Sequence, residues 1–232
     1  MPRRKKVKIW HIGDTHTYHR LLKVPKNIDL VIFSGDCSNP RDRYKNEPEV
    51  RDFMLWFANL PIKHKIFVAG NHDTSIFYKL YTRNDFTALD VTYLENEYAY
   101  VEDLKIFGSP YTPTFGDWVF NKARHSMNEI WKLVDEDTDI IVTHGPPKGI
   151  MDAILDFNGY IKQAGDIALR KHVLGRIKPK LVAFGHVHNN DDIINAGVLR
   201  LSAYPDITFS NGSLVTDGNF GKLSSNGNIL SI

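Results

Sequence analysis

The sequence predicts an α/β fold in which parallel strands carry polar side chains at one edge of a sheet. Short apolar runs without a polar face alternate with a segment of helical periodicity, as in βαβ units. Five of the apolar runs are followed at once by side chains that commonly bind metals. The length of 232 residues, of which 42% are hydrophobic, fits one compact domain, residues 1–232, with a full core.

The N-terminal half contains the clearest strands. Apolar runs at 7–12, 30–33 and 66–69 are each long enough for a buried strand and too short for a helix. Apolar residues at helical spacing predict a helix from about 49 to 60, between the second and third strands. The charged residues 40–48 before it are expected to form a loop.

The C-terminal half continues the alternation of strands and helices. We expect these elements in order: a short helix at 74–83, antiparallel strands within 93–107, a helix at 121–133, a strand at 140–142, a helix at 165–177, a strand at 181–184, and strands with loops over 193–232.

Composition and charge exclude several classes of protein. The formal charge of +2 gives no large basic surface for nucleic acid, and the cluster Arg3-Arg4-Lys5-Lys6 is local, as in a solvated strand leader. A single cysteine, Cys37, allows no disulfide within the chain. No apolar run could span a bilayer, and none follows the basic N-terminus as in a signal peptide, so we expect a cytoplasmic protein.

The polar residues at strand ends are the strongest functional signal. They are Asp14 and His16, Asp36, the consecutive Asn71, His72 and Asp73, His144, and the pair His186 and His188. Because the carboxyl ends of parallel strands meet at one edge, these side chains are expected to converge. Each piece alone is also compatible with an ordinary turn, and only the fivefold repetition argues for a site.

The ligand types predict a centre of two divalent metal ions. Imidazole, carboxylate and amide ligands without thiolates suit Mn, Fe or Zn, and the set is larger than one ion needs. Two ions about 3.5–4 Å apart, bridged by a carboxylate, are used for phosphoester displacement, and Asp36, alone at its strand end, is the natural bridge. We expect a metal-bridging hydroxide to attack phosphorus and a neighbouring histidine to protonate the leaving alkoxide.

The order of these motifs resembles the calcineurin-like metallophosphoesterase superfamily. Over most of the chain, the motifs are Asp-x-His at 14–16, Gly-Asp at 35–36, Gly-Asn-His-Asp at 70–73, His144, and Gly-His-x-His at 185–188. A closer likeness, through stretches at 106–113, 138–147 and 178–186, is to the metallophosphoesterase-domain-containing proteins, relatives of the class III cyclic nucleotide phosphodiesterases. The resemblance implies a four-layered α/β/β/α sandwich.

The resemblance also implies roles for individual residues. One metal would be held by Asp14, His16, Asp36 and His188, and the other by Asp36, Asn71, His144 and His186. His72 is similar to the general acid of the family, oriented by Asp73.

Two departures from the protein-phosphatase branch favour phosphodiesters. No Asp-Arg-Gly follows Asp36, although Arg41 is near, and Asp73 stands where that branch has Glu. His186 is present, whereas some close relatives have Gly there and are weak enzymes. These features predict a phosphodiesterase for a small nucleotide, cyclic ones included, with two divalent ions, Mn first and Fe, Zn, Ni or Co as alternatives. A phosphomonoesterase or nuclease at the same site, and a non-catalytic metal- or nucleotide-binding module, remain alternatives.

Two residues, His19 and Tyr111, are candidates for contact with the substrate. His19, three residues after His16, could reach a phosphate, and Tyr111 lies with Phe115 and Trp118 in a loop where aromatic rings either stack on a base or pack in the core. Cys37, beside Asp36, is either a packed small residue or an oxidisable thiol.

Overall fold

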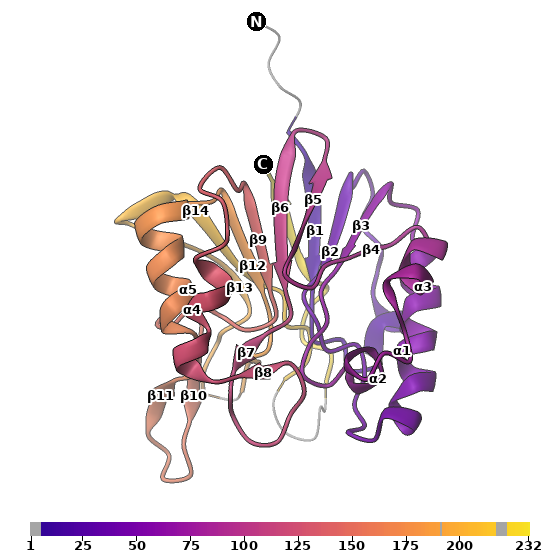
Figure 1. Cartoon of the computed structure of the whole chain (residues 1–232), viewed down its shortest axis with the longest axis horizontal. Coiled ribbons are helices and arrows are strands. Elements are labelled where there is room, and N and C mark those ends of the chain that lie inside the picture. Colours follow the sequence, from indigo (N-terminus) through magenta and orange to yellow (C-terminus); the bar gives the residue numbers. More distant parts are fainter. Residues whose placement is uncertain (1–5, 191, 217–221) are drawn as a thin grey trace, which may run out of the picture.

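Two β-sheets stacked face to face form the centre of the molecule (Figure 1). The computed structural model describes residues 6–190, 192–216 and 222–232. The first sheet contains, in spatial order, β15 (Asn228–Ser231), β1 (Lys8–Ile12), β2 (Leu30–Phe33), β3 (His64–Phe67) and β4 (Thr92–Tyr93). The second contains β13 (Gly197–Leu201), β14 (Tyr204–Asn211), β12 (Leu181–Phe184), β9 (Ile140–Thr143), β6 (Leu104–Ser109) and β5 (Glu97–Val101).

Parallel pairing dominates the interior of both sheets. In the first sheet β1, β2, β3 and β4 are parallel, and only β15 is antiparallel to its neighbour. In the second sheet β14, β12, β9 and β6 are parallel, and the edge strands β13 and β5 are antiparallel. The carboxyl ends of the parallel strands therefore lie together, at the lower edge of the sheets in Figure 1.

Helices cover the outer face of each sheet and complete four layers, α/β/β/α, as predicted. The first sheet is covered by α1 (Arg43–Ala58), α2 (Thr74–Phe77) and α3 (Arg83–Ala88). The second is covered by α4 (Asn128–Trp131) and by α5 (Ile167–His172), which continues into a π-helical turn, η3 (Val173–Ile177). Short elements occupy the loops: η1 (Tyr18–Leu21), η2 (Arg124–Ser126), β7 (Thr112–Pro113), β8 (Asn121–Lys122), β10 (Ala153–Leu155) and β11 (Ile161–Gln163).

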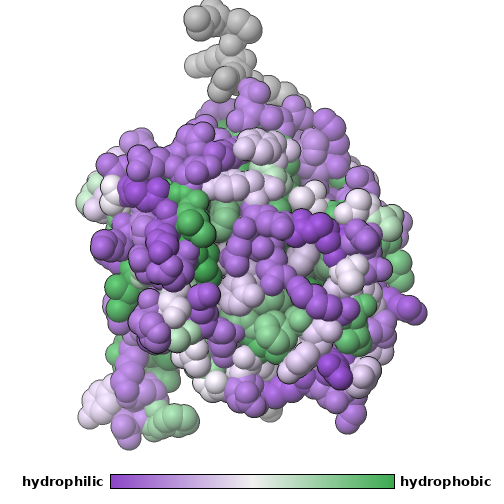
Figure 2. All heavy atoms as spheres, viewed as in Figure 1, coloured by the Kyte–Doolittle hydropathy of each residue, from purple (hydrophilic) through white to green (hydrophobic). Residues whose placement is uncertain are grey.

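The alternation of side chains along the strands explains why they are apolar throughout. In β2, Leu30 and Ile32 pack between the sheets, whereas Val31 and Phe33 pack against the helices. Both faces of this strand are thus buried, which leaves no position for a solvated side chain. Figure 2, in the same view as Figure 1, shows that hydrophilic side chains cover most of this face of the molecule, with smaller hydrophobic patches between them.

The helix predicted from residue 49 begins earlier, at Arg43, and the expected loop at 40–48 is largely helical. The Asp42 side chain accepts hydrogen bonds from the backbone N–H groups of Tyr44 and Lys45, which satisfies two N-terminal donors. The helix continues through Pro48. Its first turns face mainly solvent, so the apolar stripe alone could not indicate where it begins.

The helix predicted at 121–133 is wrong over most of its length. Residues Asn121–Lys122 form β8 and pair in parallel with β7, and a 3₁₀ turn follows before the four residues of α4. Ile130 and Trp131 still pack inward, which is the part of the periodicity that was informative. The helix at 165–177 is confirmed as α5 with its π-helical turn, and Asp166 caps it.

The last forty residues contain β13, β14 and β15, as predicted. The expectations for Arg3, Arg4 and Lys5 and for residues 217–221 lie outside the described residues. Among the described residues, none of the helices has the length and hydropathy required to span a bilayer.

Candidate metal centre

The predicted ligands converge at the carboxyl ends of five strands. Asp14 and His16 follow β1, Asp36 follows β2, and Asn71 follows β3. From the second sheet, His144 follows β9, and His186 and His188 follow β12. All except His186, which is half-buried, are buried.

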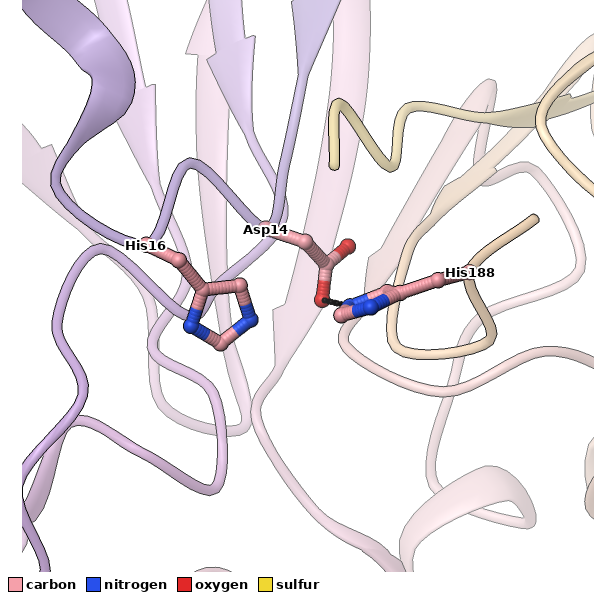
Figure 3. Close-up of side chains that lie close together, drawn as sticks. All are labelled: Asp14, His16 and His188. Carbon is pink, nitrogen blue, oxygen red and sulfur yellow. Dashed lines mark ion pairs between the residues drawn. The ribbon is translucent and has the colours of Figure 1, made fainter. Parts of the chain in front are cut away.

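One cluster contains Asp14, His16 and His188 (Figure 3). Each offers one ligand atom, and these atoms lie within 4.8 Å of one another. The Asp14 carboxylate lies between the two rings in the view, and its Oδ1 is 3.2 Å from His188 Nε2. The two sheets each contribute to this cluster, because His188 comes from a loop of the second.

A second cluster contains Asp36, His144 and His186, again with ligand atoms within 4.8 Å of one another. Asn71 adjoins it, since its Oδ1 is 2.8 Å from His144 Nε2. Asp36 lies between the clusters: its Oδ2 is 3.3 Å from His144 Nε2 and 4.0 Å from His16 Nε2. This is the position required of a carboxylate that bridges two ions.

Outer contacts orient the ligands toward the centre. His16 Nδ1 is 2.9 Å from Asn39 Oδ1, and His144 Nδ1 is 2.9 Å from the Ser34 carbonyl oxygen. Each contact leaves Nε2 directed toward the carboxylates, as in the outer hydrogen bonds of metal-binding histidines. Asp14 Oδ2 accepts a hydrogen bond of 2.7 Å from the Ser213 hydroxyl. This orientation, together with the donor types, fits a pair of divalent ions.

Two glycines allow the carboxylates to approach the backbone. A Cβ atom on Gly70 would lie 2.2 Å from Asp36 Oδ1, and one on Gly185 would lie 2.1 Å from Asp14 Oδ2. Both distances are far shorter than a van der Waals contact. Asp14 and Asp36 themselves have positive φ angles of 46° and 62°, a strain that commonly accompanies functional sites.

The charges of the site suit a cation. Burial alone would raise the pKa of Asp36, but His144 and His72 hold it well below its usual range. Burial lowers the pKa of His16 to about 4 and, helped by His144, that of His186 to about 3. Against its burial, His144 has a pKa raised to about 9 by Asp36, so a metal ion would take the place of its proton.

His72 lies at the border of the centre. Its backbone N–H donates to Asp36 Oδ1 at 2.7 Å, and its ring lies 4.9 Å from that of His16 between centroids. Its Nδ1 is 3.0 Å from the Asn39 carbonyl oxygen. Because a carbonyl oxygen only accepts hydrogen bonds, Nδ1 carries a proton in this contact, and Nε2 points away from Asn39. The sequence alone held no signal for this use of Asn39.

The predicted orientation of His72 by Asp73 is wrong. Asp73 is turned the opposite way and accepts hydrogen bonds from the backbone N–H groups of Asp36, Cys37 and Gly70. The Cys37 thiol and the Ser38 hydroxyl also donate to it. Asp73 therefore holds the loop after β2 in place, and the Asn39 carbonyl orients His72.

The predicted phosphate contact by His19 is not supported by its position. His19 is buried against the rings of Phe53 and Trp56 in α1, and its Nε2 is 3.0 Å from Asp52 Oδ2. Burial lowers its pKa to about 4, against the attraction of Asp52. The turn η1 folds back on the helix and directs this side chain there.

Tyr111 also lies away from the predicted substrate contact. Its hydroxyl donates to Glu95 at 3.2 Å and its ring packs against Phe120. The two other aromatic residues of this region lie at the centre. The Phe115 ring is 4.8 Å from that of His186, and the Trp118 ring is 4.1 Å from that of His72.

Cys37 is fully buried, and burial and Asp73 raise the pKa of its thiol well above the usual value. A thiol in this environment is a poor nucleophile, which favours the packed residue over the oxidisable one.

Comparison with known proteins gives a consistent result. The family model described as calcineurin-like phosphoesterase matches residues 7–190. Metallophosphoesterase domain-containing protein 1 of Homo sapiens is 29% identical over 80% of this chain and 62% of its own length. A UPF0046 protein of Caenorhabditis elegans is 30% identical over 92% of this chain and 71% of its own. The chain thus spans less than two thirds of the human relative.

Solved structures support the fold alone. One matches with a TM-score of 0.61 and 16% identity over 89% of this chain and 90% of the other. A crystal structure from Thermus thermophilus matches with a TM-score of 0.57 and 12% identity, over 90% and 91%.

Proposed function

The chain belongs to the calcineurin-like phosphoesterase family, and from this premise we propose that it is a metal-dependent phosphodiesterase for a small nucleotide, cyclic ones included. The observation that carries the proposal is the pair of His/Asp clusters with Asp36 between them. We propose that Asp14, His16, Asp36 and His188 hold one ion, and that Asp36, Asn71, His144 and His186 hold the other.

Two divalent ions bound there would polarise the phosphoryl oxygens and lower the pKa of a water molecule, which is the chemistry that hydrolysis of a phosphoester requires. Carboxylate, amide and imidazole ligands suit Mn²⁺, with Fe, Zn, Ni and Co as alternatives. The protein's own part is to keep Asp14 and Asp36 ionised, to direct the histidine Nε2 atoms inward, and to keep the site buried.

His72 supplies the proton in this proposal. With Nδ1 donating to the Asn39 carbonyl, Nε2 is the atom that passes a proton to the leaving alkoxide. General acid catalysis of this kind is worth about 10²–10⁴-fold in rate. The Asn39 carbonyl also fixes the plane of the ring, so the proton is delivered in one direction.

The test compares a diester with a monoester. Purified protein is loaded in turn with Mn, Ni, Co, Fe and Zn and assayed with bis-p-nitrophenyl phosphate and p-nitrophenyl phosphate. We expect faster turnover of the diester. With a cyclic nucleotide, whose leaving group is an alkoxide, His72→Ala should lose about 10²–10⁴-fold in rate with unchanged metal content. Preference for the monoester or cleavage of DNA would indicate the alternative enzymes, and no turnover with any metal would leave only a binding module.

A further inference from the structure

A cavity of about 360 Å³ opens beside the metal centre, with His186 and His188 in its wall. This volume lies in the usual range for small-molecule sites, about 300–1,000 Å³. Two loop structures form its other walls. Pro113 is the last residue of β7, and Phe115 comes from the segment between β7 and β8. The hairpin of β10 and β11, which projects at the lower left of Figure 1, contributes Lys162.

The cavity lies on the side of the retained group of a substrate. His72, the proposed proton donor, is not among its lining residues, and the ring next to His72 is that of Trp118. The leaving group must lie next to the residue that protonates it. A group that occupies this cavity is therefore the one that stays on the phosphorus.

The walls suit a flat ring. Phe115 packs at 58° against the ring of His186 and presents an aromatic surface to the cavity, and Pro113, Pro146 and Ile154 add apolar surface. Stacking of a nucleobase on an aromatic side chain is worth about 1–3 kcal/mol, irrespective of the base.

The charges suit a further anion. Arg124 and Lys162 line the cavity, and none of the described lining residues carries a carboxylate. Lys162 pairs with Asp156 on the same hairpin, at 2.7 Å; the lysine side chain is exposed and Asp156 only 11% exposed, so a phosphate would compete with this carboxylate for the lysine. These two cations belong to neither cluster of metal ligands, so they offer a site for a phosphate in addition to the scissile one.

We propose that this cavity binds the retained nucleoside of the substrate, with its base against Phe115 and a second, non-scissile phosphate on Arg124 and Lys162. The substrate class is then a nucleoside phosphodiester that bears an additional phosphate. The inference rests on the proposed phosphodiesterase activity and adds the group that the enzyme selects.

Three p-nitrophenyl diesters with the same leaving group test the proposal. Their retained groups are methyl, thymidin-5′-yl and 3′-phosphothymidin-5′-yl, and the released p-nitrophenolate reports each. Stacking of the base should make kcat/KM about tenfold higher for the thymidin-5′-yl ester than for the methyl ester. Each exposed cation is worth about two- to fivefold, so the third should exceed the second by roughly tenfold.

Variants connect each preference to its residue. Phe115→Leu should remove most of the preference for thymidine over methyl, and Arg124→Gln with Lys162→Gln should abolish the preference for the 3′-phosphate. Lys171→Gln is the matched control, because Lys171 is an exposed cation on α5 outside the cavity. Turnover of the methyl ester should be unchanged in Lys171→Gln, and in the other variants each preference is measured as a ratio to the methyl ester.

Equal kcat/KM for the second and third esters in the wild type, or an equal loss in Lys171→Gln, would overturn the inference while the phosphodiesterase activity stands. Failure of all three esters with every metal would instead contradict the activity itself. The two failures are therefore distinguishable in one set of assays.

Discussion

Replacement of Asp73 by asparagine distinguishes two roles for this residue, support of the loop after β2 and control of His72. Asp73 Oδ2 accepts from the backbone N–H groups of Asp36 and Gly70, and Oδ1 accepts from the N–H of Cys37. An asparagine has only one acceptor oxygen, which would take the Oδ2 position because two backbone donors lie there. Its NH₂ group would then face the Cys37 N–H, although the Cys37 thiol and Ser38 hydroxyl can reorient to accept.

The expected cost follows from this count. One buried backbone donor left without an acceptor costs about 1–3 kcal/mol, and the remaining contacts lose their charge assistance. We expect Asp73→Asn to reduce the free energy of unfolding by about 2–4 kcal/mol. His72→Gln leaves this network intact and should cost less than about 1 kcal/mol.

Urea unfolding followed by tryptophan fluorescence measures the difference. The chain has four tryptophans, and a chelator in the buffer removes the contribution of bound metal from every variant. The rate of diester hydrolysis is measured separately with metal restored. A wild-type unfolding midpoint for Asp73→Asn, with a rate reduced to that of His72→Gln, would show that Asp73 acts on His72 and would refute the assignment of Asp73 to the loop.

Three further predictions concern the glycines, pH and metal. Gly70→Ala should lower metal content and stability, because the new Cβ would lie 2.2 Å from Asp36 Oδ1. Gly175→Ala is the control, since a Cβ at that position would have no atom within 4 Å. Metal analysis and thermal melting compare the two variants. Burial lowers the pKa of His11 to about 3, so the unfolded chain binds its proton more readily. The free energy of unfolding is then unaffected by His11 above about pH 6.5, and it decreases by about 1.4 kcal/mol per pH unit between pH 6.5 and pH 3. The slope of unfolding free energy against pH should be shallower in His11→Gln, and an unchanged slope would contradict the burial of a neutral His11. Chelation of metal should lower the Tm, and Mn²⁺ at about 100 times its Kd should restore about 2.7 kcal/mol; a Tm indifferent to both would argue against the metal centre.

The convergence of the candidate metal ligands could be predicted from the sequence because topology, not detailed packing, brings them together. A run such as Ile140–Val142 is too apolar for any position but a buried strand, and a residue directly after it must lie at the sheet edge. His144 and Asp36 are far apart in the sequence, yet this rule predicts that they converge, and in the structure His144 Nε2 lies 3.3 Å from Asp36 Oδ2. The prediction of a helix at 121–133 was wrong because it depended on detailed packing. The apolar spacing came from a few side chains that face inward, and not from a preference of the backbone for a helix.

The pairing of His72 with Asp73 failed because neighbours in sequence seldom face each other. Consecutive residues project in different directions, so adjacent polar residues more often serve two networks than one. Here Asp73 turns into the loop after β2, and His72 turns to the Asn39 carbonyl. The group that orients a proton donor is therefore better sought at the end of a neighbouring strand than at the next position in the sequence.

The cavity walls could not be predicted for a different physical reason. Phe115 and Arg124 follow the two-residue strands β7 and β8, and Lys162 lies in β11. The sequence predicted none of these three short strands, and only the paths of a loop and a hairpin bring the residues to one surface. Because none of them contributes to the metal clusters, changes there should alter which diester is cleaved while metal content stays constant. In the proposed function, the strand ends supply the chemistry and the loops supply the choice of substrate, so mutation should separate the two.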